Sequence, residues 1–282
     1  MSHITRLLAI AIFCLLGGCS ISSLMFYPLK PFPATPDQLG MVYEPVHHQA
    51  SDGTQLVSWW LPASESAEQK PKGTVVFLHG NAQNISYHQL NVNWLPNQGF
   101  NVFMLGYRQF GQSDGIAKLP NIFLDVHAAL DWVRDRVGDE PIFILGQSMG
   151  ATLAVFGLAS YEFKGEVDGV VLDAAFDSYP GMAATAMSRN WFTWPLSIPA
   201  YLITDDYDPI DWITEWPQLP LLMMHSPVDQ VVPYEKGRSL YEHAMVEKRW
   251  IDSEGAHIAT FGYEHLRLAL IEFLQEASKT RQ

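Results

Sequence analysis

Short runs of apolar residues recur along the chain and predict buried strands. The runs lie at residues 74–78, 102–105, 142–145, 170–172 and 221–224. Between these runs, residues 120–137 and 263–276 place apolar side chains at steps of three and four, which predicts amphipathic helices. Strands that are apolar throughout need cover on both faces. The pattern therefore predicts an α/β fold with a mostly parallel central sheet and helices on both of its faces.

Regions on either side of this alternation differ in composition. Residues 43–48 and 55–61 read as a strand pair around the turn Ser51-Asp52-Gly53, at the start of a domain that spans residues 41–282. Residues 19–40 hold four prolines and little periodicity. Such a segment is typical of a tether, or of an irregular arm packed on the domain.

An aromatic and proline-rich stretch interrupts the alternation at about residues 176–217. Its aromatic and proline residues include Trp191, Phe192, Trp194, Pro195, Pro199, Tyr201, Tyr207, Trp212 and Trp216. Long insertions between strands usually serve a function. We expect a helical cap with an apolar lining over a binding site. The alternative is an extra pair of helices whose aromatic rings only pack on the sheet.

The first 18 residues have the layout of a signal peptide. A short polar start with Arg6 precedes the apolar run 7–16, which is too short to span a bilayer comfortably. The sequence Leu16-Gly17-Gly18-Cys19 that follows resembles the bacterial lipobox. The resemblance implies a diacylglyceryl anchor on Cys19 and an outer-membrane protein facing the periplasm, because Ser20 is not the aspartate of inner-membrane lipoproteins. A plain secretory signal is the alternative.

Composition narrows the classes of partner and chemistry. The chain has 282 residues, of which 48% are hydrophobic, enough for a substantial core. Its formal net charge of −13 would repel polyphosphate, so we expect no nucleic-acid partner. Cys14 and Cys19 are the only cysteines. Removal of the signal and lipidation of Cys19 would leave a domain without a disulfide or a thiol nucleophile.

Polar residues follow several predicted strands at their carboxyl ends, where parallel sheets bind ligands. After residues 74–78 comes His79-Gly80-Asn81, and after 142–145 comes Gly146-Gln147-Ser148-Met149-Gly150. His225 and Asp229 follow 221–224, and Gly255-Ala256-His257 follows a last predicted strand at 249–251. In chain order these ends supply a serine, an acid and a histidine.

These pieces resemble the alpha/beta-hydrolase superfamily over essentially the whole mature chain. The matching stretches are FLHGNAQN, GYRQFGQSDG, FILGQSMGA, HSPVDQVVP and GAH. The resemblance is greatest to serine hydrolases with an HGN loop and a tyrosine-arginine turn. It implies an oxyanion hole made by the backbone N–H groups of Met149 and Asn81. Gln109 and Ser226 stand where that branch usually has glycine, and Ala256 replaces a glycine, which blurs the substrate class.

The chemistry of the residues leads to the same site. A serine hydroxyl is a poor nucleophile unless a base removes its proton, and His257 is the candidate base for Ser148. A carboxylate must fix the tautomer of that histidine. Asp229 is the preferred acid, and Asp173, which follows residues 170–172, is the alternative. Glycine at 146 and 150 would let the backbone turn sharply and expose Ser148.

We therefore expect a serine hydrolase that cleaves a carboxylic ester, or a related acyl bond of a small molecule, through an acyl-enzyme. A peptidase or an acyltransferase with the same site, or a non-catalytic binding module with this fold, are the alternatives. No cofactor is expected. No metal is expected either, because His79 and His225 lack a third ligand and the cluster Asp205, Asp206, Asp208 and Asp211 lacks the glycine and glutamate of a calcium loop. Tyr107 and Arg108 are expected to support the loops around the nucleophile.

Overall fold

The computed structural model describes residues 21–64, 70–189, 200 and 203–279. The predicted signal peptide (residues 1–18), the predicted lipidation site Cys19 and the aromatic residues between 191 and 199 lie outside the described residues. Within the described part of the chain, no helix combines the length and the apolar character that a bilayer-spanning helix requires.

A single large sheet of eight strands runs through the domain in the order β10-β9-β8-β7-β4-β6-β3-β2. The neighbours from β10 to β6 pair in parallel, and β6, β3 and β2 pair antiparallel. The strands are β2 (Glu44–Gln49), β3 (Gln55–Leu61), β4 (Thr74–Leu78), β6 (Asn101–Met104), β7 (Ile142–Gln147), β8 (Gly169–Asp173), β9 (Leu221–His225) and β10 (Lys248–Asp252). The predicted parallel sheet with an antiparallel strand pair at its start is confirmed.

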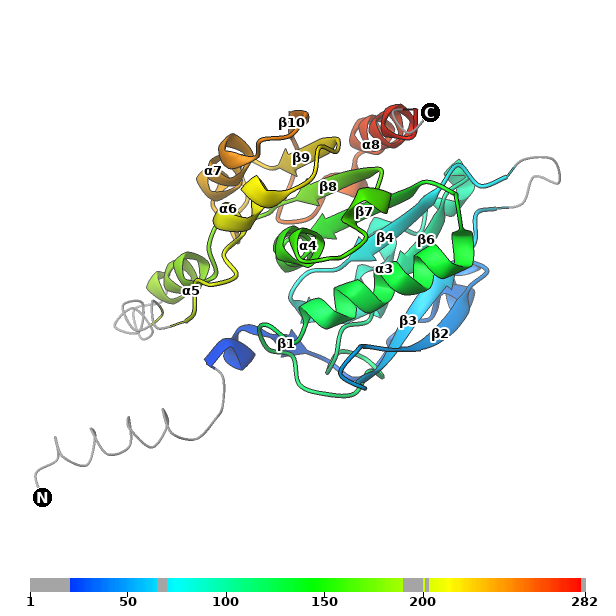
Figure 1. The fold of residues 1–282 in the computed structure, drawn as a ribbon, viewed down its shortest axis with the longest axis horizontal. Coiled ribbons are helices and arrows are strands. Elements are labelled where there is room, and N and C mark those ends of the chain that lie inside the picture. The colour runs from blue at the N-terminus through cyan, green and yellow to red at the C-terminus, as the bar shows by residue number, and fades with distance from the viewer. Residues whose placement is uncertain (1–20, 65–69, 190–199, 201–202, 280–282) are drawn as a thin grey trace, which may run out of the picture.

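Both faces of the sheet are covered, which explains why its central strands are apolar at every position. In β4, Val76 and Leu78 belong to one core cluster, whereas Val75 and Phe77 belong to another. Successive side chains of a strand point to opposite faces, so each strand supplies both clusters. Figure 1 shows α3 and α4 lying across one face of this sheet.

The helices divide between the two clusters. The first cluster takes residues from α3 (Phe123–Val137), α4 (Met149–Ala159) and α7 (Tyr234–His243), and the second from α8 (Glu264–Ala277) and the short α2 (Ile85–His88). The predicted helices at 120–137 and 263–276 correspond to α3 and α8. Short 3₁₀ turns complete the described chain: η1 (Ile21–Met25), η2 (Pro36–Leu39), η3 (Gln89–Asn91), η4 (Pro96–Gln98), η5 (Lys164–Glu166), η8 (Ile213–Glu215) and η9 (Thr260–Gly262).

The described part of the segment 19–40 packs on the domain as an arm, and the tether description does not apply to it. Phe26 is 5% exposed and belongs to the first core cluster. The two-residue strand β1 (Tyr27–Pro28) pairs in parallel with β5 (Ala82–Gln83), in the loop after β4. Burial of an aromatic ring and backbone pairing hold the segment against the domain, and its prolines keep it irregular.

The insertion between β8 and β9 contains α5 (Tyr179–Ser188), α6 (Pro209–Trp212) and η8. The rings of Tyr207 and Trp212 lie 5.0 and 4.6 Å from the ring of Phe156 on α4. The indole of Trp216 donates a hydrogen bond of 2.9 Å to the carbonyl of Val155, also on α4. Among the described residues of the insertion, Tyr207, Trp212 and Trp216 therefore pack on α4, whereas the alternative interpretation of the sequence placed such rings on the sheet.

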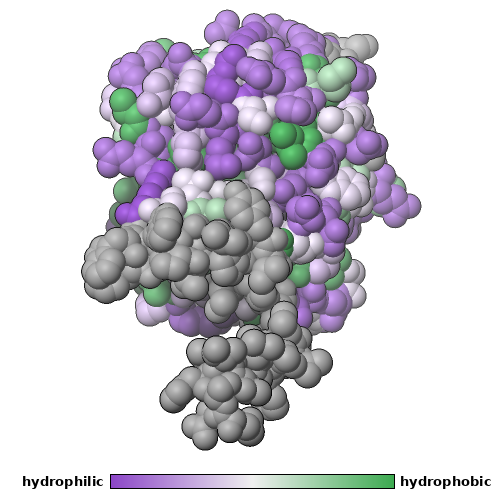
Figure 2. Space-filling view, turned by 90° about the vertical axis from the view of Figure 1, so that its left-hand side faces the viewer, coloured by the Kyte–Doolittle hydropathy of each residue, from purple (hydrophilic) through white to green (hydrophobic). Residues whose placement is uncertain are grey.

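One side of the molecule is mostly hydrophilic. Figure 2 shows the side of the molecule on which α5 lies, and hydrophilic residues dominate it wherever described atoms are visible. Hydrophobic residues form small separated spots on that side.

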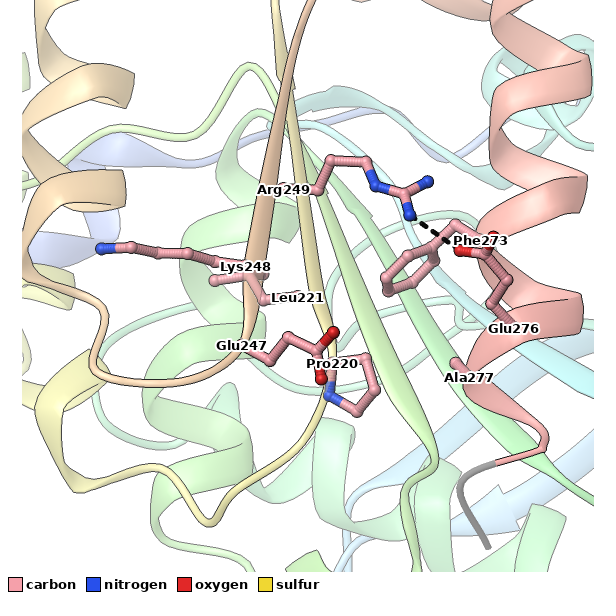
Figure 3. Close-up of a pocket in the computed structure, with 8 residues that line it drawn as sticks. All are labelled: Pro220, Leu221, Glu247, Lys248, Arg249, Phe273, Glu276 and Ala277. Atoms are coloured by element: carbon pink, nitrogen blue, oxygen red, sulfur yellow. Dashed lines mark hydrogen bonds and ion pairs between the residues drawn. The ribbon is translucent and has the colours of Figure 1, made fainter.

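A small cavity of about 120 Å³ lies at the amino ends of β9 and β10 (Figure 3). Leu221, Phe273 of α8 and the ion pair between Arg249 and Glu276 line it. Because β9 begins at Leu221 and ends at His225, the cavity lies at the opposite end of the strands from the residues that follow β9.

Candidate active site

Ser148 occupies the sharp turn between β7 and α4. Its backbone has φ 54° and ψ −119°, a conformation that residues with a side chain rarely adopt. A Cβ atom at Gly150 would lie 1.9 Å from the carbonyl oxygen of Leu78, and one at Gly146 would lie 2.6 Å from Cα of Ala151. This close approach requires glycine on both sides of the turn. The strained turn places Ser148 at the carboxyl end of the sheet.

The structure brings Ser148, His257 and Asp229 into one hydrogen-bonded line. Nε2 of His257 lies 2.9 Å from Oγ of Ser148, and Nδ1 of the same ring lies 2.7 Å from Oδ2 of Asp229. The three residues come from different loops, which follow β7, β10 and β9 respectively. The arrangement gives the histidine one nitrogen for the hydroxyl proton and one that is bonded to a carboxylate.

Three hydrogen-bond partners and a second histidine surround the carboxyl group of Asp229. Oδ1 accepts hydrogen bonds from the backbone N–H groups of Val231 (2.7 Å) and Val232 (3.0 Å), and Oδ2 lies 3.5 Å from Nε2 of His225 as well as close to His257. Burial alone would raise the pKa of Asp229, but the hydrogen bonds from His225, His257 and Val231 outweigh burial and hold the pKa below its usual range. The side chain therefore stays negatively charged opposite the imidazole.

Both candidate oxyanion donors lie on segments next to Ser148. Met149 is the first residue of α4, so its N–H has no acceptor within the helix. A Cβ atom at Gly80 would lie 3.6 Å from Cβ of Ser148, which places the loop of Gly80 and Asn81 beside the serine. The side chain of Asn81 faces the N-terminal arm, where its Nδ2 donates to the carbonyl of Met25 at 2.5 Å.

Comparison with known proteins identifies the family. A model described as the alpha/beta hydrolase fold matches residues 73–206. The chain is 33% identical to the uncharacterized protein YfhR of Escherichia coli strain K12, over 83% of the chain and 81% of YfhR. It is 30% identical to the alpha/beta hydrolase domain-containing protein WAV2 of Arabidopsis thaliana, over 76% of the chain and 71% of that protein. The chain belongs to the alpha/beta-hydrolase family. The solved structure of the Pyrococcus furiosus esterase Pf2001 has the same fold, with a TM-score of 0.72 at 22% identity over 89% of the chain and 98% of the esterase.

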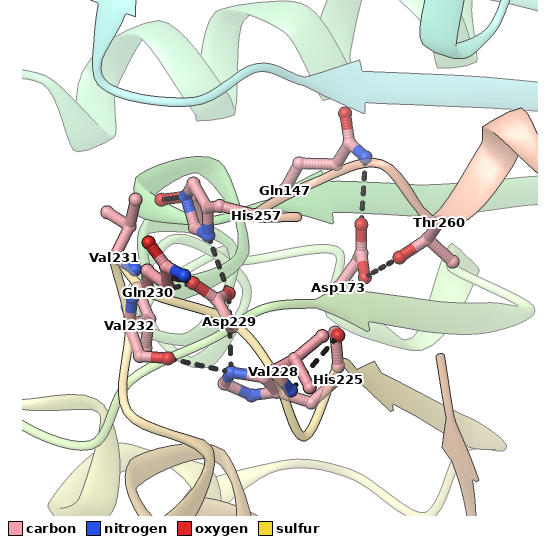
Figure 4. A network of polar contacts seen from close by, with 12 residues as sticks. Gln147, Asp173, His225, Val228, Asp229, Gln230, Val231, Val232, His257 and Thr260 are labelled. Atoms are coloured by element: carbon pink, nitrogen blue, oxygen red, sulfur yellow. Dashed lines mark hydrogen bonds and ion pairs between the residues drawn. The ribbon is translucent and has the colours of Figure 1, made fainter. Parts of the chain in front are cut away.

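Asp173 is engaged elsewhere in this alpha/beta-hydrolase and does not contact His257. Its Oδ2 accepts a 2.8 Å hydrogen bond from Nε2 of Gln147, and its Oδ1 accepts a 2.7 Å bond from the hydroxyl of Thr260. Figure 4 shows this group beside the separate group of Asp229, His225 and His257. Burial raises the pKa of Asp173, whose side chain is fully enclosed. Asp173 thus links Gln147, the residue before Ser148, to the loop that carries His257. The geometry favours Asp229 as the carboxylate partner of His257.

Sequence reasoning did not find the residues that join the acid loop to the histidine loop. The hydroxyl of Ser226 donates a 2.7 Å hydrogen bond to the carbonyl of Gly255, and the N–H of Ser253 donates to the carbonyl of His225 at 2.9 Å. The signal for Ser226 in the sequence is that it differs from the glycine expected from the resemblance to serine hydrolases. Its bond to Gly255 holds the loops of Asp229 and His257 together.

The tyrosine-arginine turn supports the loop next to the nucleophile, as expected. The hydroxyl of Tyr107 donates a 3.3 Å hydrogen bond to the carbonyl of His79. The guanidinium of Arg108 lies 2.7 Å from Asp125 and 2.8 Å from Asp52. Arg108 and Asp125 are buried, so this ion pair fixes the turn within the domain.

The residues that the structure describes include no group of three or more histidine, cysteine, aspartate or glutamate side chains arranged to hold a metal ion. His79 and His225 instead contact backbone oxygens: Nδ1 of His79 lies 2.7 Å from the carbonyl of Gly80, and Nε2 of His225 lies 3.1 Å from that of Val232. Asp208 accepts the N–H of Tyr179 at the start of α5.

Proposed function

We propose that this alpha/beta-hydrolase is a serine hydrolase that cleaves a carboxylic ester through an acyl-enzyme. The observation that supports it most strongly is the line from Oγ of Ser148 to His257 and Asp229, with distances of 2.9 and 2.7 Å. Both distances are within hydrogen-bond reach, which general-base activation of a nucleophile requires. The low pKa of Asp229 favours a histidine that gains a positive charge as it accepts the proton.

In the first half of the proposed reaction, Oγ of Ser148 attacks the acyl carbon while Nε2 of His257 takes the hydroxyl proton. The negative charge that develops on the former carbonyl oxygen is stabilised by the N–H groups of Met149 and Asn81. Collapse of this intermediate breaks the ester bond, and Nε2 of His257 gives its proton to the departing alkoxide. The products of this half are a free alcohol and an acyl group on Ser148.

In the second half, His257 takes a proton from a water molecule, whose oxygen attacks the acyl carbon. Collapse releases the carboxylic acid and returns the proton to Ser148. An amine or an alcohol in place of water would give acyl transfer, and an amide in place of the ester would give peptidase activity. Product analysis with an added amine or alcohol acceptor separates hydrolysis from acyl transfer.

The test uses p-nitrophenyl esters of increasing acyl length, with enough protein to record the first turnover. We expect hydrolysis by the unaltered chain and a loss of at least about 10³-fold in kcat for Ser148→Ala and for His257→Ala. Ser188→Ala and His265→Ala, two exposed positions of matched type, should keep the activity. Hydrolysis that persists in Ser148→Ala would refute the proposal, and an inactive but folded chain would favour a binding module.

We further propose that the chain is a lipoprotein of the bacterial cell envelope, anchored through Cys19 in the outer membrane. Ser22 is 3% exposed and its Oγ accepts the N–H of Leu119 at 3.2 Å, so the domain begins close to the proposed anchor. Three residues span at most about 11 Å, which would keep the domain near the bilayer surface. Mass spectrometry of the mature N-terminus tests the anchor: a lipid on Cys19, absent in Cys19→Ala, supports it, and an unmodified or differently cleaved terminus contradicts it.

A further inference from the structure

The loop that carries the proposed oxyanion donor Asn81 is bonded to the N-terminal arm through its own side chain. Oδ1 of Asn81 accepts the N–H of Tyr27 at 3.3 Å, and its Nδ2 donates to the carbonyl of Met25 at 2.5 Å. The amide thus pairs with backbone groups on both sides of Phe26, whose ring is in the core. Asn81 therefore connects the loop beside Ser148 to a segment more than fifty residues earlier in the chain.

The residues after Asn81 continue this connection. Nδ2 of Asn84 donates to the carbonyls of Leu29 and Pro31, both at 2.8 Å. The hydroxyl of Ser86 accepts the N–H of Ala34 at 3.1 Å. Asn84 is 1% exposed and Ser86 is 4% exposed. Without the arm, these buried polar groups would lose partners, which is unfavourable.

The backbone of the loop also depends on the arm. Pro28 pairs with Gln83 across β1 and β5, and the N–H of Leu29 donates to the carbonyl of Gln83 at 2.9 Å. Gln83 has φ 72°, in the left-handed region that residues with a side chain rarely enter. Such a conformation persists only where the surroundings determine it. The arm supplies these surroundings two residues after the proposed oxyanion donor.

We propose that residues 25–34 are a positioning element for the oxyanion hole, acting through the side chains of Asn81 and Asn84. This inference rests on the proposed function, because it assigns the arm a role in the same reaction. The arm fixes the loop that follows Gly80, and the loop sets the place of the Asn81 N–H relative to Ser148. An arm displaced from the loop leaves the line of Ser148, His257 and Asp229 intact but misplaces an oxyanion donor.

The substitution Asn84→Ser in the full chain tests this role. Serine can still accept the N–H of Ser86 as an N-cap, as Asn84 does at 3.1 Å, but it cannot supply both bonds to Leu29 and Pro31. We expect kcat to fall by roughly 10- to 100-fold while KM changes less than about twofold, because the lost interaction acts in the transition state. The inhibition constant of a trifluoromethyl ketone, which forms an oxyanion on reaction with a serine, should rise by the same factor.

Gln38→Ala is the matched control. Oε1 of Gln38 accepts the N–H of Thr35 at 3.0 Å, and within the described chain its side chain forms no hydrogen bond with the loop at 81–89, so kcat and the inhibition constant should stay unchanged. Ser86→Ala removes the hydrogen bond to Ala34 and changes the shape of the side chain less than Asn84→Ser does. It takes the place of Asn84→Ser if that variant does not fold. Thermal melting of each variant reports whether the domain is intact.

The outcomes separate the two proposals. A parallel loss of kcat and of trifluoromethyl ketone affinity, at constant KM and in a folded protein, supports the role of the arm. A lower melting temperature with unchanged kcat and inhibition constant shows that the arm only stabilises the fold, and overturns the inference while the proposed function stands. An unaltered chain that neither hydrolyses esters nor reacts with the ketone overturns both.

Discussion

The substitution Asp229→Asn replaces one carboxylate oxygen of the site by an NH₂ group. The hydrogen bonds of Asp229 determine which way the new amide points, and therefore how far kcat falls. Oδ1 of Asp229 accepts two backbone N–H groups, from Val231 at 2.7 Å and Val232 at 3.0 Å. The carbonyl oxygen of an asparagine must keep that place, which turns its NH₂ group toward Nδ1 of His257. An NH₂ group is a donor only, so it selects the tautomer with the proton on Nε2, which then cannot take the proton of Ser148.

The expected magnitude follows from this change of tautomer. A wrong tautomer in a serine-histidine-carboxylate site costs about 10⁴-fold in kcat. That factor corresponds to about 5 kcal/mol of transition-state stabilisation. Because asparagine has nearly the shape of aspartate, the substrate site stays intact, and KM should change far less than kcat.

The assay compares kcat and KM for a p-nitrophenyl ester in the unaltered chain, in Asp229→Asn and in Asp211→Asn, with circular dichroism to verify the fold. Asp211 is exposed, so the same substitution there should leave kcat within about twofold. A folded Asp229→Asn protein that keeps more than about a tenth of the activity would refute the reasoning. Loss of activity in Asp173→Asn but not in Asp229→Asn would instead identify Asp173 as the carboxylate that supports His257.

Three further predictions concern stability. Gly150→Ala should lower the free energy of unfolding by more than about 2 kcal/mol in denaturant titrations, because the new Cβ would lie 1.9 Å from the carbonyl oxygen of Leu78. Arg108→Met should cost about 3–5 kcal/mol in the same titrations, because Asp125 would remain buried without its partner. Burial lowers the pKa of His48 from 6.5 to about 4, so below pH 6.5 the unfolded chain binds a proton that the folded chain does not. His48 alone should lower the free energy of unfolding by up to roughly 3 kcal/mol between pH 6.5 and 4, and this contribution should be lost in His48→Gln.

Each of these predictions has a control at a position without the stated contact. A Cβ atom at Gly262 would meet nothing within 4 Å, so Gly262→Ala should change stability little. Arg249 forms an ion pair with Glu276, but both side chains are nearly half exposed, so Arg249→Met should cost less than about 1 kcal/mol. The charge of His47 lowers the pKa of His48 less than burial does, so His47→Gln should change the pH dependence much less than His48→Gln. Equal effects of a control and its partner would contradict the corresponding explanation.

The fold could be predicted from the sequence because each central strand meets two covered faces. Val75 and Val76 enter different clusters, so the strand must be apolar at every position, and the pattern shows it. Ser148, Asp229 and His257 could be located because parallel strands bring their carboxyl ends to one edge of the sheet. The spacing of the strands along the chain thus predicts which polar residues meet.

Other features of the fold and the site depend on contacts that leave no periodic pattern in the sequence. The strand β1 has two residues, too few for any pattern, and its pairing with β5 joins segments more than fifty residues apart. The bonds of Asp173 with Gln147 and Thr260 likewise depend on the folded backbone. The aromatic residue Trp216 predicts burial but does not say against which element, and the structure places it on α4.

The most direct test of the central claim is reaction with a fluorophosphonate probe, followed by mass spectrometry of the labelled peptide. The account predicts a single adduct on Ser148 in the unaltered chain, and almost none in His257→Ala, because the hydroxyl then lacks its base. His265→Ala should label like the unaltered chain. A folded, unaltered chain without an adduct, or an adduct on another residue, would contradict the claim that His257 activates Ser148.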